Sequence, residues 1–224
     1  MGESSSVLRP AARESLDDPA HTRNRILSAA ARLFSRRGFR GTTTRQIAEI
    51  VGILSGSLFH YFRSKDAMLF EVMLEAARSL CEQAEAVAAS HPGAPERLRA
   101  LIRLQLECLA GESTRDFYAV LISEWRELDE SSRPQLTLLR KRYFAIWHEA
   151  LQRCAQQGLL RAEPKATQLA LHGAINWANT WYEPGGRLNL ESYASVLESF
   201  VLEREAARPE SAAAASGLAG ALPV

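Results

Sequence analysis

Apolar residues recur with the spacing of α-helices through most of this chain, and this periodicity limits the fold more than any other feature. Near the start, Ile26, Ala30, Leu33 and Phe34 lie one or two turns apart, and Gly38 follows as a helix stop. Later stripes obey the same rule, for example Phe117, Leu121, Trp125 and Leu128. No alternating run long enough for a half-buried β-strand occurs. The sequence therefore predicts an all-α protein of about nine helices without internal repeats.

Composition divides the chain into four segments. Residues 1–20 are rich in Ser, Pro, Arg and Asp, and residues 208–224 in Ala, Ser, Gly and Pro, so we expect a flexible N-terminal arm and a disordered tail. Between them we expect one helical domain over residues 21–66 and a larger one over residues 67–207. A chain of 224 residues is long enough to bury a substantial core.

The sequence does not indicate a membrane protein or a secreted one. No apolar run reaches the roughly 18 residues that cross a bilayer, and the N-terminus lacks the apolar segment of a secretion signal. Cys81, Cys108 and Cys154 lie far apart, outside any metal or redox motif, so we expect reduced, packed side chains. A cytoplasmic protein with no metal and no cofactor is the expectation.

The net charge of +1 hides a strong asymmetry. Residues 22–65 hold nine basic residues against one acid, Glu49, so this segment carries +8 and the rest of the chain −7. A cationic segment joined to an anionic one indicates that the first meets a polyanion such as DNA. On charge alone, a solvated basic face without a partner is the alternative.

Two short helices within the basic segment have the spacing of a helix-turn-helix unit, over about residues 43–62. Thr44 is a candidate N-cap for the first, which ends at Gly52. Ser55 is a candidate N-cap for the second, which runs through Phe62, and Ser64 then caps a long helix. The apolar residues of the motif point into a small core: Ile47, Ala48, Val51, Ile53, Leu58 and Phe62.

The other side chains of this motif are free to face a DNA groove. Ser55, Gly56 and Ser57 are small enough for close approach to base edges, and Phe59 can contact a thymine methyl group. Arg45 can donate two hydrogen bonds to guanine O6 and N7. We expect phosphate contacts from a further set: Thr43, Thr44, His60, Tyr61 and Lys65.

The stretch TTTRQIAEIVGILSGSLFHYFRSKDAML resembles the N-terminal signature of the TetR family of bacterial transcriptional regulators. The resemblance covers about residues 22–75 and rests on a threonine-rich helix start, the pair IA, a glycine turn, an aromatic pair and the pattern F-x-S-K. It implies a homodimer whose two recognition helices enter successive major grooves of a pseudo-palindromic operator, and it assigns the DNA contacts to the residues named above. Because few of them have long polar side chains, DNA shape is expected to contribute to specificity.

In this family the C-terminal helices dimerise and hold an effector, which draws attention to the segment TQLALHGAINWANTWY. One stripe of it, with the last helix, is a candidate dimer interface: Ala170, Ala174, Trp177, Trp181, Tyr193, Val196, Leu197, Phe200 and Val201. The candidate effector pocket combines residues of several helices: Arg103, Phe117, Tyr118, Trp125, Trp147, His172 and Asn176. For His172 and Asn176, ordinary hydrogen bonding between helices is the alternative.

The segment WANTWYEPGGRL also resembles the TetR subgroup that responds to fatty or steroid-ring acyl-CoA thioesters. An acyl-CoA thioester or a neutral hydrophobic aromatic ligand is therefore expected as effector. Basic candidates for the CoA phosphates are Arg97, Arg99, Arg103, Arg140, Lys141 and Arg142. The overall prediction is a homodimeric repressor released from its operator by a small molecule, and the alternative is an architectural or regulatory DNA-binding protein without an effector.

An enzyme is not expected. The segment HEALQ at His148 falls short of the zinc motif HExxH, because Gln152 stands where the second histidine is needed. The chain also lacks a glycine-rich phosphate loop and a nucleophile elbow.

Overall fold

The computed structural model describes residues 19–183 and 186–203, and in these residues the chain is helical with no strand. In chain order the elements are α1 (Pro19–Arg37), α2 (Thr44–Val51), the 3-10 helix η1 (Ser55–His60), α3 (Lys65–Ser90), α4 (Ala94–Ala110), α5 (Arg115–Ser123), the 3-10 helix η2 (Trp125–Glu127), α6 (Arg133–Gln156), α7 (Pro164–Trp181) and α8 (Leu190–Val201). The predicted all-α fold is confirmed. Over the same residues no helix is long and apolar enough to span a bilayer, and no cluster of His, Cys, Asp and Glu could hold a metal ion.

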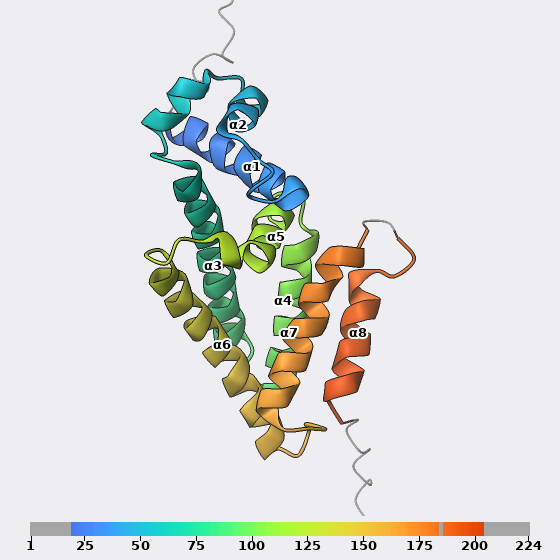
Figure 1. The fold of residues 1–224 in the computed structure, drawn as a ribbon. Coiled ribbons are helices and arrows are strands. Elements are labelled where there is room, and N and C mark those ends of the chain that lie inside the picture. Colours follow the sequence, from blue (N-terminus) through green and yellow to red (C-terminus); the bar gives the residue numbers. More distant parts are fainter. Residues whose placement is uncertain (1–18, 184–185, 204–224) are drawn as a thin grey trace, which may run out of the picture.

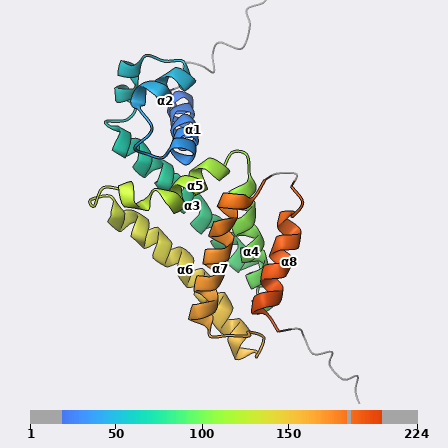
Figure 2. The same cartoon turned by 45° about the vertical axis from the view of Figure 1, so that its right-hand side comes forward.

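The helices form a small head and a larger body, joined by α3 (Figure 1). The head consists of α1, α2 and η1, at the top of Figure 1. From there α3 runs into the body, where it packs against α5 and α6. On the other flank α7 and α8 lie side by side in both views (Figures 1 and 2), and Tyr193 Oη of α8 donates to Ala174 O of α7 at 3.0 Å. The helix-turn-helix segment and the last two helices are therefore far apart in the molecule.

Two hydrophobic clusters share α3. The first contains Phe34 and Met68 and continues into Val120 of α5 and Leu136 of α6, so it extends from the head into the body. The second surrounds the fully buried Trp147 and draws on α3, α4, α6, α7 and α8. The domain boundary predicted at residues 66 and 67 falls inside α3, and the core of the head does not stop there.

The N-cap of α2 corrects the sequence prediction. It is Thr43 and not Thr44: Thr43 Oγ1 accepts a hydrogen bond from Gln46 N at 3.3 Å, and Gln46 Oε1 accepts one from Thr43 N at 2.9 Å. This reciprocal capping box requires a Gln or Glu three residues after the cap, and only Thr43 has one. The prediction of Gly52 as the end of α2 is confirmed, since it adopts φ 77° and closes the helix in the left-handed conformation.

The second helix of the motif is shorter than predicted. It is a 3-10 helix that ends at His60 and not at Phe62, in keeping with the short runs that this geometry tolerates. Ser55 does not cap it, because the N-cap position is Leu54 and no side chain hydrogen-bonds there. Ser64 does cap α3, and its Oγ accepts from Ala67 N at 3.0 Å.

The ends of the chain are described only in part. Pro19 and Ala20, predicted to belong to a flexible arm, form the first residues of α1. The other predictions for residues 1–18 and 204–224, including the tail at 208–224, lie outside the described residues. Pro184 and Gly185, within the segment EPGGRL, also lie outside them.

Candidate DNA-binding face and effector pocket

The candidate DNA contacts gather on the outer surface of the head. The exposed ones are Thr43, Arg45, Gly56, Phe59 and His60, and the half-buried ones are Thr44, Ser55, Ser57, Tyr61 and Lys65. Leu58 is fully buried beneath η1, which turns the neighbouring residues of this short helix outward. This surface is free to meet a partner, and the base and phosphate contacts themselves stay predictions.

Hydrogen bonds inside the head hold this surface in shape. Arg25 Nη2 donates to Val51 O at 2.6 Å and ties α1 to the end of α2. The capping box occupies the backbone N–H of Thr43, so this group is not available to a phosphate. The hydroxyl of Thr43 accepts from Gln46 N and keeps its own proton to donate.

Lys65 has a structural role that the sequence did not reveal. Its Nζ donates to Phe39 O and to Thr42 O, both at 2.8 Å, and lies 4.2 Å from the centre of the Phe39 ring. These contacts fasten the loop between α1 and α2 to the start of α3. The ammonium group has three N–H donors, so one remains for a phosphate, and that contact stays a prediction.

Two apolar side chains on the head were missed from the sequence. Leu54 is 80% exposed and Ile50 50%, while Phe59 nearby is 55% exposed. Leu54 lies in the turn between α2 and η1, where a leucine that the core does not bury is a signal for an external contact. Apolar groups of this kind can contact thymine methyl groups.

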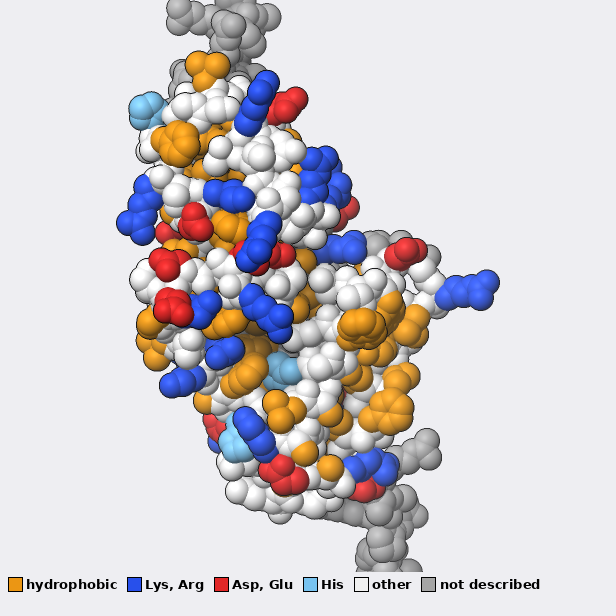
Figure 3. Space-filling view, in the orientation of Figure 1, with side chains coloured by type: hydrophobic (Ala, Val, Ile, Leu, Met, Phe, Trp, Pro, Cys, Tyr) orange, Lys and Arg blue, Asp and Glu red, His pale blue; other side chains and the backbone are white. Residues whose placement is uncertain are grey.

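The body contains a cavity of about 280 Å³, partly open to the surface, between α3, α4, α5, η2, α6 and α7. Its apolar wall consists of Ala77, Leu80, Leu109, Leu121, Ile122, Leu136 and Leu139, and the aromatic and polar residues are Gln105, Tyr118, Trp125, Arg140, Tyr143, Phe144, His172 and Asn176. In Figure 3 a hollow is visible between the segments that Figure 1 labels α6 and α7, with hydrophobic and histidine side chains inside it. Apolar walls with a few polar groups are typical of sites for small organic ligands.

The cavity brings together four of the residues predicted for a pocket: Tyr118, Trp125, His172 and Asn176. The other three do not line it, so the prediction was wrong for this cavity. Phe117 packs between the two hydrophobic clusters, and Trp147 is fully buried behind the ring of His172, at 4.7 Å between ring centres. Large aromatic side chains on an amphipathic helix are more often core than pocket, which explains both errors.

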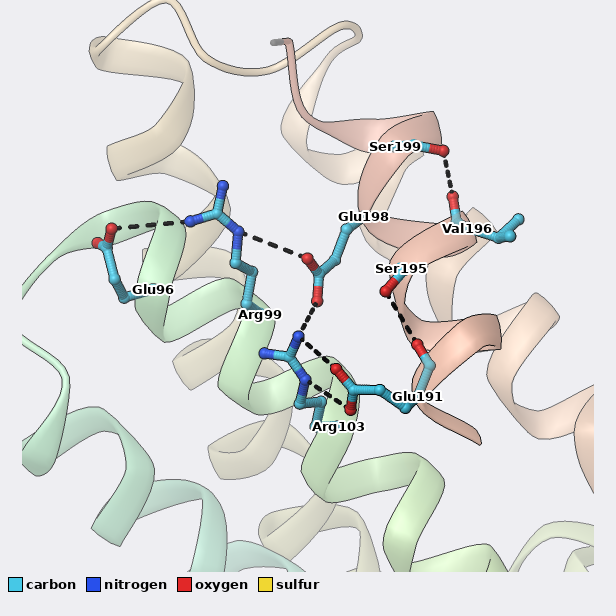
Figure 4. Close-up of polar contacts among 8 residues, drawn as sticks. All are labelled: Glu96, Arg99, Arg103, Glu191, Ser195, Val196, Glu198 and Ser199. Atoms are coloured by element: carbon cyan, nitrogen blue, oxygen red, sulfur yellow. Dashed lines mark hydrogen bonds and ion pairs between the residues drawn. The ribbon is translucent and has the colours of Figure 1, made fainter. Parts of the chain in front are cut away.

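Arg103 is the third error, and its side chain belongs to an ion-pair network between α4 and α8 (Figure 4). Its Nη2 lies 3.1 Å from Glu191 Oε1 and 3.2 Å from Glu198 Oε1. Arg99 Nε reaches the other oxygen of Glu198 at 3.5 Å. The acidic partners are distant in the sequence, so nothing near Arg103 could have indicated that its charge is already neutralised.

At the polar end of the cavity, His172 is held neutral. Its Nδ1 lies 2.8 Å from Gln168 O, so we assign the ring proton to Nδ1. Burial lowers the pKa of His172 to about 4, against the opposing effect of the hydrogen bond to Gln168 O. The acceptor Nε2 is buried and finds no partner within the described part of the chain. A ligand with an O–H or N–H group would satisfy it.

Asn176 supplies a donor beside this acceptor. Tyr143 Oη donates to Gln105 Oε1 at 2.9 Å, and Gln105 Nε2 donates to Asn176 Oδ1 at 2.9 Å. This chain directs the acceptor oxygen of Asn176 to Gln105 and leaves its amide N–H groups to the cavity. At this end the cavity therefore presents a neutral acceptor from His172 and a neutral donor from Asn176.

The wall of the cavity is connected to the head through η2. Trp125 lines the cavity, while Glu124, directly before η2, and Glu127, its last residue, bind the head. Glu124 Oε2 accepts from Phe39 N at 3.3 Å, and Glu127 Oε2 accepts from Arg40 Nε at 2.8 Å. Trp125 and two of the contacts between head and body therefore belong to one short segment.

The candidate dimer face is partly exposed and partly core. Trp177 is 66% exposed, Phe200 71% and Val196 42%, and they form an apolar surface on α7 and α8 with the small residues Ala170 and Ala174. Trp181 and Tyr193 are half-buried and stack edge to face at 5.0 Å. Leu197 and Val201 are buried in the protomer and have little surface to offer a partner, so their assignment to a dimer interface stays a prediction.

Comparisons with known proteins agree with this architecture. A model for bacterial regulatory proteins of the tetR family matches residues 26–72, and a model for the tetracyclin repressor-like C-terminal domain matches residues 91–204. The repressor KstR2 of Rhodococcus jostii is 31% identical over 185 residues, which cover 81% of this chain and 89% of that protein.

Solved structures give the same result. AibR in complex with isovaleryl coenzyme A and operator DNA has 28% identity and a TM-score of 0.74, over 80% of this chain and 97% of that one. PfiT, described as a superantigen, has 37% identity and a TM-score of 0.67, over 83% of this chain and 98% of that one. The fold and the head define a helix-turn-helix transcriptional regulator. The chain belongs to the TetR family of bacterial regulatory proteins, and the resemblance read from its sequence is confirmed.

Proposed function

We propose that this protein is a homodimeric repressor that leaves its operator when an acyl-CoA thioester enters the cavity of the body. The observation that carries the proposal is the position of Trp125, which lines the cavity between two residues, Glu124 and Glu127, that bind the head. A ligand that binds better to one position of η2 shifts the dimer toward the matching separation of its two heads. Regulation then requires no contact between ligand and DNA.

On DNA, η1 enters the major groove of each half-site. Arg45 reads guanine, while Phe59 and the exposed Leu54 contact thymine methyl groups. Thr44, His60 and Tyr61 bind phosphates together with the remaining donor of Lys65. The apolar surface around Trp177 and Phe200 joins two copies so that both heads face the same side of the duplex.

The effector class is inferred from the cavity and from two relatives. AibR has been solved with isovaleryl coenzyme A and operator DNA, and KstR2 of Mycobacterium tuberculosis is described as a ketosteroid transcriptional regulator. Both are similar to this chain over about four fifths of its length. An acyl group suits the leucine-rich wall, and the amide groups of pantetheine suit the neutral donor and acceptor at Asn176 and His172. A hydrophobic aromatic ligand is the alternative for the same space.

Catalysis is not part of the proposal, since KstR2 and other curated relatives of this chain are transcriptional repressors. A repressor acts where the chromosome is, and we therefore place the protein in the cytoplasm.

Thermal unfolding of the full chain with a panel of ligands tests the effector. Ligands that bind the folded protein raise the melting temperature by mass action. We expect one class of thioester to do so, and we expect His172→Phe, which removes the free acceptor, to reduce the shift. If no thioester and no aromatic compound changes the melting temperature, the protein is an effector-free DNA-binding protein.

A further inference from the structure

A second, shallower groove lies next to the cavity on α6 and α7. It is lined by Arg140, Lys141, Phe144, Ala145, His148, Lys165 and Gln168. Arg140 and Phe144 line the cavity as well, so the groove continues from the opening of the cavity along the surface. Blue side chains flank the hollow between these helices in Figure 3. The cavity thus opens beside a basic surface.

The cations of this groove differ from most others in the body because no acid neutralises them. Seven arginines between residues 91 and 203 form ion pairs: Arg97, Arg99, Arg103, Arg133, Arg142, Arg153 and Arg161. By contrast, Arg140, Lys141 and Lys165 have no ion pair within the described residues. The guanidinium of Arg140 instead lies 4.7 Å from the centre of the Trp125 ring. Three unpaired cations in a segment of negative net charge indicate an anionic ligand.

One carboxylate lies close to the groove, and its charge is already engaged. Glu163 caps α7, where Oε1 accepts from Lys165 N and Oε2 accepts from Ala166 N, both at 2.8 Å. These backbone hydrogen bonds lower the pKa of Glu163, with smaller contributions from the nearby charges of His148 and Lys165. The structure has no ion pair between this carboxylate and the ammonium of Lys165 in the described residues, and the two charges interact only at longer range. With Arg140 and Lys141 beside Lys165, the groove keeps a net positive charge.

The cavity is too small for a whole acyl-CoA molecule, so only part of the effector fits inside it. Sites that enclose a drug-sized ligand have about 300–1,000 Å³. The cavity, at about 280 Å³, holds an acyl group and part of a pantetheine arm but not a nucleotide. The phosphates of a bound acyl-CoA must then lie outside, at the opening that Arg140 shares with the groove.

We propose that the groove formed by Arg140, Lys141, His148 and Lys165 binds the phosphate groups of the effector's nucleotide, outside the apolar cavity. This inference rests on the proposed acyl-CoA effector. Lys141 and Lys165 attract the phosphates as mobile ammonium groups, and Arg140 binds them while it stacks on Trp125. The nucleotide thereby contacts a residue that touches the turn controlling the head, so it contributes to release as well as to affinity.

Calorimetric titration of the full-length dimer with octanoyl-CoA, isovaleryl-CoA and the corresponding acyl-pantetheines tests the groove. For the thioester that binds, we expect the CoA form to bind the wild type about tenfold tighter than the pantetheine form. The double variant Lys141→Ala/Lys165→Ala should lose this ratio and keep the affinity for acyl-pantetheine. Arg142→Ala is the matched control, since it removes a cation of the same helix that already pairs with Glu85.

The outcomes distinguish the two proposals. An unchanged ratio of affinities in the double variant, or equal binding of both forms by the wild type, overturns the groove and leaves the thioester effector standing. If Arg142→Ala loses the same ratio of affinities, the effect comes from the overall charge of the protein and not from the groove. That result would also overturn the proposal. If the wild type binds neither CoA nor pantetheine thioesters, both proposals are wrong.

Discussion

The candidate DNA-binding face and the cavity proposed for the effector are built in opposite ways. The face occupies residues 43–65, one continuous segment, and its outer side chains contribute little to the core. The cavity combines residues from Ala77 to Asn176, on six elements, and its polar members belong to hydrogen-bond chains inside the body. A surface made of one segment can change without unfolding the protein. Substitutions in a cavity made of many segments also affect the packing of the core, so folding and ligand recognition are coupled in the cavity.

The largest effect should come from a substitution behind the cavity. Trp147→Ala removes a fully buried side chain that packs on His172, and we expect a loss of about 3–5 kcal/mol in the free energy of unfolding. Urea denaturation at one protein concentration measures it, because stability of a dimer depends on concentration. Phe59→Ala on the DNA-binding face is the control, with an expected change below about 0.5 kcal/mol. Comparable losses for both would remove the contrast between the two regions.

The second effect depends on pH and on His172. Its pKa is 6.5 when unfolded and about 4 in the fold, so the unfolded chain binds the extra proton between these values. Stability is therefore complete above pH 6.5 and decreases as the pH falls toward 4, by about 3 kcal/mol at most. His172→Phe keeps an aromatic ring and should remove this slope, whereas His60→Gln, at an exposed histidine, should keep it. The free energy of unfolding is measured by denaturation at several pH values from 7 to 4. If it falls by the same amount in His172→Phe and in the wild type, the result contradicts the burial of a neutral imidazole.

The third effect concerns the DNA-binding face. Arg45→Ala should weaken operator binding by about 1–3 kcal/mol, relax one base position and leave the urea midpoint unchanged. Lys65→Ala should weaken all DNA sequences alike and also lower the melting temperature, because Lys65 holds the carbonyls of Phe39 and Thr42. Competition between operator and random DNA separates the two variants. Equal losses on both DNAs for Arg45→Ala would exclude base reading by this residue.

The smallest effect on folding should accompany a change in regulation. Glu127→Gln weakens the exposed contact to Arg40 and is expected to leave the melting temperature nearly unchanged. Operator affinity and ligand affinity, each measured alone, should stay close to wild type, while the ligand releases less DNA. Glu130→Gln is the control, because the ion pair of Glu130 in the described part of the chain is with Arg133 of the same segment and does not reach the head. If ligand still releases Glu127→Gln from DNA as it does the wild type, η2 does not couple the two regions.

The contrast between a face made of one segment and a cavity made of many also decides what could be predicted from the sequence. Local patterns identify the helix-turn-helix because Gly52, Ser64 and the buried Leu58 act on their immediate neighbours. They also place all ten candidate DNA contacts within one segment. The exchange of Thr43 for Thr44 as the cap is a one-residue error, and the position of Gln46 would have resolved it.

The cavity could be predicted only in outline. Tyr118, Trp125, His172 and Asn176 line it, but the role of Gln105 depends on partners 38 and 71 residues away. Arg103 was likewise predicted to line the cavity, but its charge is engaged by ion pairs with Glu191 and Glu198, on a helix that is distant in the sequence. Besides His172 and Asn176, the position of Gln105 inside an apolar stripe was an available signal for the polar end of the cavity, since buried polar groups need partners.

The most direct test of the central claim, that a ligand in the body controls DNA binding by the head, is a fluorescence-anisotropy titration on the protein's own promoter DNA. The titration is made without ligand and then with octanoyl-CoA, isovaleryl-CoA and hydrophobic aromatic compounds, at one fixed salt concentration because phosphate contacts make affinity salt-dependent. We predict tight, sequence-selective binding that one ligand class abolishes. Equal affinity for promoter and random DNA, or selective binding that no ligand disturbs, would contradict the account.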